Sequence, residues 1–263
     1  MSSSIGRTLR LMRHPMVWMA GIYFGFIILL AFGVGSVLGM FTGTQFASIL
    51  LLLLPLAIGG VLGMLQYDDY SPVLFFMEGK KHYFGLVIPG ILTLLVIIIT
   101  IILLEVPISL IGGSIDQITL SGLCVGVSIP VLLLTMFYAP VIVSEGATVT
   151  HSLLRSVTLV SYDIMSALKF WIVGMFTQFI AFFAMSMVWA GLTYEHLEEY
   201  ANLSIAEQQA IYSLFTAEEW MVMLGDGLFF FVLFLSLCII VTTTFLLCYL
   251  FVCYTDAKKA GPS

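Results

Sequence analysis

Several basic side chains lie next to long apolar segments, where they could contact phosphate groups. Lys80 and Lys81 precede one apolar segment, and Lys169 precedes another. His151 and Arg155 are four residues apart, which places them on one face if that segment is helical. We predict that these five residues contact lipid headgroups or a partner protein. The alternative is an ordinary solvated surface.

Residue types that bind metals occur together at Glu195, His196, Glu198 and Glu199. No second histidine is nearby, and the spacing matches no familiar zinc-binding helix. The sequence also contains no G-x-S-x-G motif, no phosphate-binding glycine loop and no Cys-x-x-Cys pair. We therefore predict no catalytic residue, no metal site and no cofactor, and we expect that the protein is not an enzyme.

The composition excludes a soluble fold. Of the 263 residues, 61% are apolar and 9% are charged, and the mean hydropathy is +1.13. A soluble domain has about 25% charged residues, and a chain of 29 kDa lacks the interior to bury so much apolar surface. The net charge is −6, and we expect no nucleic-acid partner. Most of the chain must lie in lipid.

The pattern predicts an all-α, multi-pass membrane protein. About 20 apolar residues of helix cross a bilayer, and long runs without alternating polarity argue against a β-barrel. A single membrane domain over 1–263 is expected. Six stretches qualify as spans, at about 16–40, 45–65, 83–108, 120–143, 169–192 and 228–253.

The basic residues predict the orientation. With six spans, all nine Lys and Arg residues fall on one side of the membrane, and the loops of the other side have none. Cytoplasmic loops are enriched in Lys and Arg. We therefore expect both termini in the cytoplasm and the protein in the cell membrane.

Two cytoplasmic segments are predicted to be interfacial amphipathic helices, at about 72–79 and 147–168. Ser71-Pro72 is a helix-start signal, and Gly79 is a plausible stop. In the second segment, apolar residues recur every three or four positions, which forms one stripe on a helix. They are Val149, Leu153, Val157, Val160, Ile164 and Leu168. Because each segment follows one span and precedes the next, we suspect a degenerate internal repeat.

The polar segment 193–226 is acidic and is predicted to lie outside. Two S/T-x-x-E capping boxes, at 204–207 and 216–219, predict helix starts. Asn202-Leu203-Ser204 matches the acceptor sequence for N-glycosylation, so Asn202 is a candidate site. We interpret this acidic segment as a solvated surface; the alternative is cation binding or acidic docking.

Glycines four residues apart let helices approach closely in lipid. Five such pairs occur: Gly21/Gly25, Gly35/Gly39, Gly39/Gly43, Gly59/Gly63 and Gly122/Gly126. We expect most of them to pack within the bundle, and an oligomer seam is the alternative.

Prolines within spans can break helices at substrate sites, although they also occur in inert membrane helices.

One stretch resembles a known group of proteins. Met136–Gly146 ends in an aromatic, proline and valine run with Glu-Gly, and Ser152–Ser156 contains an Arg-Ser pair. This pattern is similar to a broad group of prokaryotic, chiefly archaeal, six-span membrane proteins related to the membrane domain of some bacterial glycerophosphoryl diester phosphodiesterases. Ser71–Leu86 resembles the earlier surface helix of that group. The resemblance implies a fold but no activity, because the catalytic barrel is absent from this chain.

These features lead to one main functional hypothesis. We expect a non-enzymatic multi-pass protein that organises membrane lipids or partner proteins at the cytoplasmic face. The alternative is a permease-like transmembrane subunit of a transporter that works with a separate ATPase, which the proline-broken spans motivate. An intramembrane enzyme is the third candidate.

Overall fold

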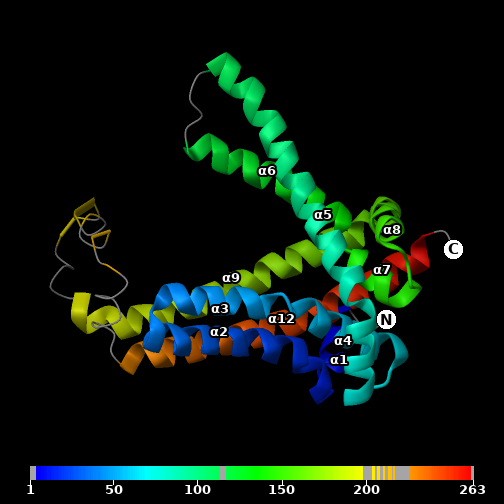
Figure 1. The fold of residues 1–263 in the computed structure, drawn as a ribbon, viewed down its shortest axis with the longest axis horizontal. Helices are drawn as coiled ribbons and strands as arrows, with labels where there is room; N and C mark the ends of the chain where they lie inside the picture. Colours follow the sequence, from blue (N-terminus) through cyan, green and yellow to red (C-terminus); the bar gives the residue numbers. More distant parts are fainter. Residues whose placement is uncertain are drawn as a thin grey trace. The chain divides into compact units, whose positions relative to one another are not determined.

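The computed structural model describes residues 4–112, 117–197 and 226–261, and eight positions between 203 and 216. This part of the chain is helical and contains no strand (Figure 1). The elements are α1 (Ser4–Leu11), the 3-10 helix η1 (Pro15–Trp18), α2 (Met19–Leu38), α3 (Met40–Leu51), α4 (Leu54–Tyr67), α5 (Pro72–Gly112), α6 (Gln117–Thr135), α7 (Tyr138–Glu145), α8 (Val149–Tyr162), α9 (Ile164–Leu197) and α12 (Asp226–Ala260).

Six helical segments in the described part of the chain are long and apolar enough to cross a membrane. This confirms the predicted all-α class and the predicted number of spans, and it identifies a multi-pass membrane protein. The segments are Pro15–Leu38, Phe41–Tyr67, Pro72–Glu105, Leu120–Glu145, Ile164–Tyr194 and Gly227–Ala260.

The chain divides into two compact units. One comprises Met1–Ala20, Leu52–Gly174 and Thr244–Ser263, and the other comprises Gly21–Leu51 and Met175–Thr243. All nine Lys and Arg residues belong to the first unit, which we call the cationic unit. The second, which we call the cation-free unit, contains no Lys or Arg. The division by contacts therefore coincides with a division by charge.

In the cation-free unit, the turn between the first two spans is shorter than the sequence suggested. Gly39 alone separates α2 from α3, with φ of +93°, which glycine adopts readily. The predicted spans at 16–40 and 45–65 leave residues 41–44 as the turn, which is wrong because these residues are already helical. A Cβ on Gly43 would collide with the carbonyl oxygen of Ala31, so the two helices are in close contact there.

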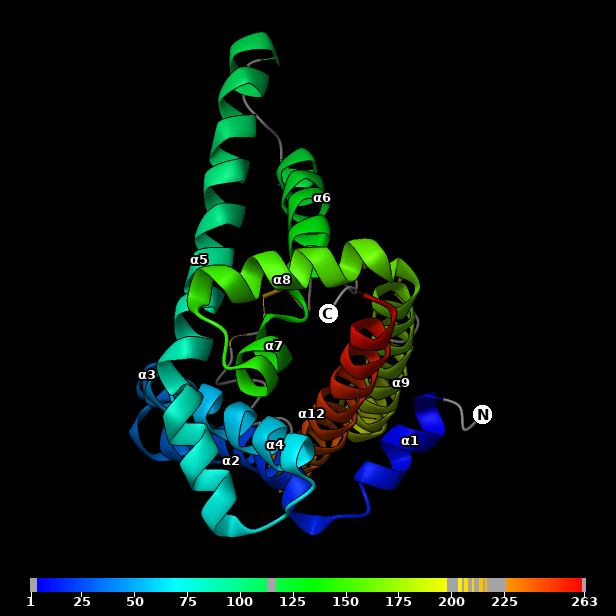
Figure 2. The ribbon, with the colours of Figure 1, turned by 90° about the vertical axis from the view of Figure 1, so that its right-hand side faces the viewer.

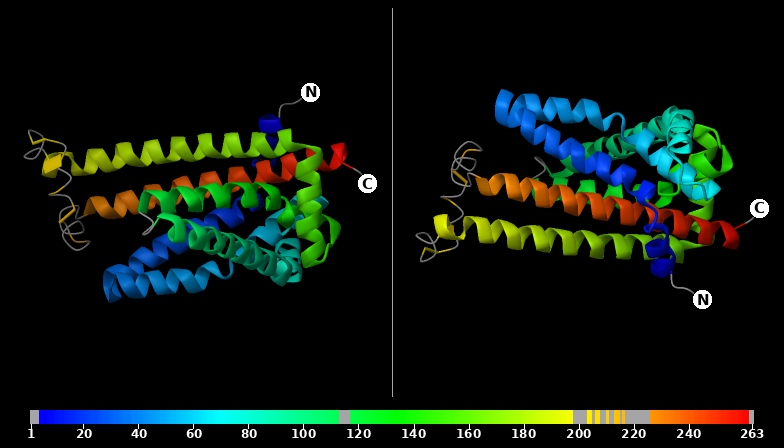
Figure 3. Two further views of the ribbon diagram at one scale, coloured as in Figure 1. Left: turned by 90° about the horizontal axis from the view of Figure 1, so that it is seen from above. Right: turned by 90° about the horizontal axis from the view of Figure 1, so that it is seen from below.

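The same unit contains parts of α9 and α12, which run side by side in both views of Figure 3. Trp189 of α9 packs edge-to-face on Phe231 of α12, with ring centroids 5.0 Å apart. A Cβ on Gly25 of α2 would lie 2.6 Å from Cγ1 of Ile240 on α12. At Gly25, as at Gly43, glycine thus serves packing within the chain.

In the cationic unit, α5 begins at Pro72, as Ser71-Pro72 predicted. The Ser71 hydroxyl accepts a hydrogen bond from the Leu74 amide at 3.3 Å. The predicted stop at Gly79, and with it a separate helix over 72–79, is wrong, because α5 continues without a break to Gly112. A Cβ on Gly79 would lie 2.5 Å from the Leu56 carbonyl oxygen of α4. Gly79 therefore permits close helix packing rather than a helix end.

The second span is interrupted between α3 and α4, where Pro55 removes a backbone donor. Carbonyl groups near the break receive hydrogen bonds from tyrosine side chains. The Tyr83 hydroxyl donates to the Leu52 carbonyl at 2.9 Å, and the Tyr23 hydroxyl donates to the Leu50 carbonyl at 2.8 Å. The cost of exposing backbone polar groups in hydrocarbon is thereby offset.

The fourth span is interrupted in the same way, between α6 and α7 and close to Pro140. Here the side chain of Ser156, on α8, inserts into the backbone hydrogen bonding. Its hydroxyl donates to the Leu134 carbonyl at 2.8 Å and accepts from the Phe137 amide at 3.0 Å. Figure 2 shows α8 lying across the end of α7.

The predicted helix over 147–168 is wrong as a single element, because it divides at Asp163. The Asp163 carboxylate accepts hydrogen bonds from the amide and the hydroxyl of Ser166, which caps the start of α9. Ile164 and Leu168 therefore belong to α9. The face of α8 that packs against the protein contains Ser152, Ser156, Leu159 and Val160, and only Val160 of these belongs to the predicted apolar stripe.

The outer segment is only partly described. The first capping box is confirmed: the hydroxyl and the amide of Ser204 both donate to the Glu207 carboxylate, at 2.6 and 2.9 Å. These hydrogen bonds hold the pKa of Glu207 below its ordinary value. Asn202 and Glu219 lie outside the described residues, and so does the predicted glycosylation site.

Candidate surface for anionic lipids and partners

The first half of α5 has two different faces. Phe75, Glu78 and Gly79 pack against glycines of α4, and a Cβ on Gly60 or Gly63 would lie within 2.6 Å of that face. The opposite face is exposed and consists of Val73, Phe76, Met77, Lys80 and Phe84. Each of these residues lies three or four positions from another of them, and together they form one stripe on the helix. We call this the α5 stripe.

The α5 stripe combines large exposed apolar side chains with one cation. Val73 is 77% exposed and Phe84 is 72% exposed. Lys80 is also exposed and lies between them in the sequence. A long Lys side chain beside apolar groups can extend its ammonium group to lipid phosphates while its stem stays in the apolar region. The stripe thus has the residue types of a membrane interface.

Lys81 has a different environment from its neighbour. Its ammonium group lies 3.2 Å from the buried Glu78 carboxylate, and His82 Nε2 lies 3.1 Å from the same group. A buried carboxylate is costly unless charged or polar groups compensate it. Lys81 therefore helps to stabilise the α4–α5 packing, and Lys80 is the better candidate for external contacts.

Arg155 is also part of an internal cluster. Glu145, the last residue of α7, lies 3.5 Å from Arg155 Nε of α8 and 3.3 Å from Lys258 Nζ of α12. The Tyr254 hydroxyl donates to the same carboxylate at 2.9 Å. One carboxylate thus ties the end of α7 to two other helices. Arg155 contributes to this cluster rather than to a free phosphate site.

The predicted contact residues are not brought together into one site. Lys80, His151 and Lys169 are exposed, whereas Lys81 and Arg155 form ion pairs. Within the described residues, five exposed cations form no ion pair: Arg10, Arg13, Lys80, Lys169 and Lys259. Sequence reasoning missed Arg10, Arg13 and Lys259 as candidates. For Arg10 and Arg13, the signal was the lack of an acidic residue three or four positions away in the sequence.

The outer face of α8 is partly apolar. Leu154 is 62% exposed and Val157 is 36% exposed, while His151 lies exposed one turn before Leu154. The serine face of the same helix is used for internal packing. Leu154, Val157 and His151 are therefore available for contact with lipid or with another protein.

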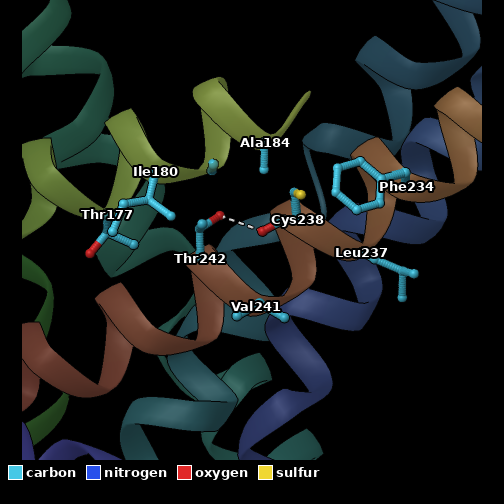
Figure 4. Close-up of a pocket in the computed structure, with 9 residues that line it drawn as sticks. Thr177, Ile180, Ala184, Phe234, Leu237, Cys238, Val241 and Thr242 are labelled. Carbon is cyan, nitrogen blue, oxygen red and sulfur yellow. Dashed lines mark hydrogen bonds between the residues drawn. The ribbon is translucent and has the colours of Figure 1, made fainter. Parts of the chain in front are cut away.

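The cation-free unit contains a cavity of about 360 Å³ between α9 and α12. Figure 4 shows its wall, which includes Ile180, Phe234 and Val241. The Thr242 hydroxyl bonds to the Cys238 carbonyl of its own helix at 2.8 Å. The cavity is apolar, and it offers no charged group to a polar solute.

The described residues contain no group of three or more His, Cys, Asp or Glu side chains that could hold a metal ion. The side chains at 195–202 lie outside this description, so the Glu195–Glu199 group is not placed. The four cysteines are free thiols in the helices.

Comparison of the chain with protein-family models, with curated proteins and with solved structures found no match.

Proposed function

We propose that this protein is a non-enzymatic membrane scaffold that organises anionic lipids at the cytoplasmic face. The α5 stripe supports this proposal most directly, because one face of a helix is packed while the other combines apolar side chains with Lys80. Each basic residue near an anionic bilayer surface contributes about 1 kcal/mol of attraction. The exposed Lys169 of the same unit would add to the effect.

The proposal includes an orientation in the cell membrane, with both termini in the cytoplasm. The distribution of Lys and Arg supports it: all of them belong to the cationic unit, and the cation-free unit contains the acidic outer segment. Retention of basic loops on the cytoplasmic side is the general rule for helical membrane proteins.

The test uses the full protein in bilayers that contain spin-labelled phosphatidylglycerol or phosphatidylcholine. We expect the wild type to immobilise more phosphatidylglycerol, and Lys80→Ala to reduce this preference. Lys259→Ala is the matched control, since it removes one exposed cation that lies outside the α5 stripe. Equal immobilisation of the two lipids by the wild type would refute the proposal.

A protein partner at α8 remains part of the proposal, since Leu154 and Val157 are exposed beside His151. A photo-cross-linking residue at position 154 distinguishes the two kinds of contact in intact cells. Protein adducts would support a partner at α8, and adducts with lipid alone would restrict the role to lipid.

The second candidate is a permease-like subunit that works with a separate ATPase. The interruptions near Pro55 and Pro140 favour it, because discontinuous helices often form transport sites. Ser156 and Tyr83 satisfy carbonyl groups at these breaks, however, which favours a structural role. Stoichiometric co-purification of a nucleotide-binding protein, lost in Leu154→Asp, would support the permease.

Two further relationships are proposed. A kinship with the prokaryotic six-span proteins is supported by the Glu145-Gly146 helix end and the Arg155-Ser156 pair.

An oligomer seam on α6 is supported by Gly122 and Gly126, where an added Cβ would meet nothing within 4 Å. Sedimentation of wild type and Gly126→Leu in detergent tests the seam, and an unchanged mass would refute it.

A further inference from the structure

A cavity of about 220 Å³ lies between α1 and the end of α12 in the cationic unit. Figure 3 (right) shows α1 against this part of α12. Two arginines line the cavity together with apolar groups. The lining residues are Arg7, Arg10, Leu11, Phe251, Val252 and Thr255.

This cavity has more guanidinium groups than carboxylates that pair with them. Arg7 forms an ion pair with Asp256 through one terminal nitrogen. Its Nε is buried and has no hydrogen-bond partner among the described residues. Arg10 is exposed and forms no ion pair within the same part of the chain. A buried guanidinium donor without a partner is costly, so an additional acceptor would stabilise the arrangement.

The other walls indicate what else the ligand contains. Leu11, Phe251 and Val252 are apolar, and the Thr255 hydroxyl donates to the Val252 carbonyl at 2.8 Å. The outer face of α1 presents Ile5 and Leu9, which are 44% and 54% exposed. An exposed apolar face with arginines beside it is typical of a helix in the headgroup region. A ligand in this cavity would therefore contact apolar side chains as well as arginine.

We propose that this cavity binds one anionic phospholipid, with the phosphate between Arg7 and Arg10 and the acyl chain along Leu11, Phe251 and Val252. Guanidinium groups suit phosphate because their planar donors bind it in pairs. The inference rests on the proposed lipid role, and it adds a defined site that joins the N-terminal helix to α12.

Native mass spectrometry of the full protein in detergent tests the proposal with phosphatidylglycerol and phosphatidylcholine as probes. We expect one phosphatidylglycerol to be retained, and Arg10→Gln to weaken its retention about tenfold. Arg13→Gln is the matched control, because Arg13 is a nearby exposed arginine that does not line the cavity. Equal losses in the two variants, or equal retention of phosphatidylcholine, would overturn the proposal.

Two further measurements separate the alternatives. Displacement of the lipid by millimolar inorganic phosphate would assign the cavity to the free ion and overturn a lipid site. Lys80→Ala is expected to leave this single lipid bound while it lowers the general preference for anionic lipid. If Lys80→Ala has no effect in bilayers but Arg10→Gln releases the lipid, the scaffold role fails and the binding site stands.

Discussion

The hydroxyl of Ser156 donates to the carbonyl of Leu134, 22 residues earlier in the chain, at 2.8 Å. The same oxygen accepts the Phe137 amide, so one side chain of α8 bridges the interruption in the fourth span. A helix that seemed amphipathic through its apolar stripe is thus held to the protein by its serine face. The arrangement explains how a broken helix can be stable in an apolar environment.

Ser156→Ala should destabilise the protein by about 1–3 kcal/mol, since it leaves a buried donor and a buried acceptor without a partner. Thermal unfolding of the purified protein in detergent measures the change. Ser161→Ala is the control, because the Ser161 hydroxyl is exposed and bonds to the Val157 carbonyl of its own helix. Equal melting temperatures for the two variants would show that the bridge is unimportant.

Gly79→Ala should also destabilise the protein, by about 1–3 kcal/mol, as overpacking does. The added Cβ would lie 2.5 Å from the Leu56 carbonyl oxygen, and backbone cannot move aside as a side chain can. Gly126→Ala places the same methyl group in open space and should be nearly neutral in the monomer. A similar loss in both variants would point to helix flexibility rather than α4–α5 contact.

The Glu207 carboxylate should titrate below the ordinary glutamate pKa, because two donors of Ser204 favour its charged form. The capping box is then fully formed above the ordinary pKa. It is lost as the pH falls through the lowered pKa of the folded state. Carboxyl carbon chemical shifts of labelled Glu207 report this titration. Ser204→Ala should return the pKa toward its ordinary value, and an unchanged titration would contradict the capping role.

The proposed orientation predicts which positions react with an impermeant maleimide in intact cells. A cysteine at Lys259→Cys should react only after the membrane is permeabilised, whereas Glu207→Cys should react from outside. The wild type, which retains the four native cysteines of the helices, provides the background. Reaction of Lys259→Cys in sealed cells would reverse the orientation.

Local sequence was sufficient to predict the features that depend on neighbouring residues. The six spans follow from the hydropathy of each segment, and the start of α5 follows from Ser71-Pro72. The Ser204–Glu207 capping box is equally local. The same local reading misjudged Gly79 as a stop, because glycine suits both a helix end and a close helix contact.

Contacts between segments that are far apart in the sequence determine the remaining features. The face of α8 that turns inward is set by the hydrogen bonds of Ser156 to Leu134 and Phe137. Arg155 is not available for external contacts, because it forms an ion pair with Glu145, ten residues earlier. The Arg7–Arg10 cavity exists because α1 lies against Phe251 and Val252, some 240 positions later. Periodicity and composition carry no information on such pairs, since the free energy of each contact arises only when the chain brings its two partners together.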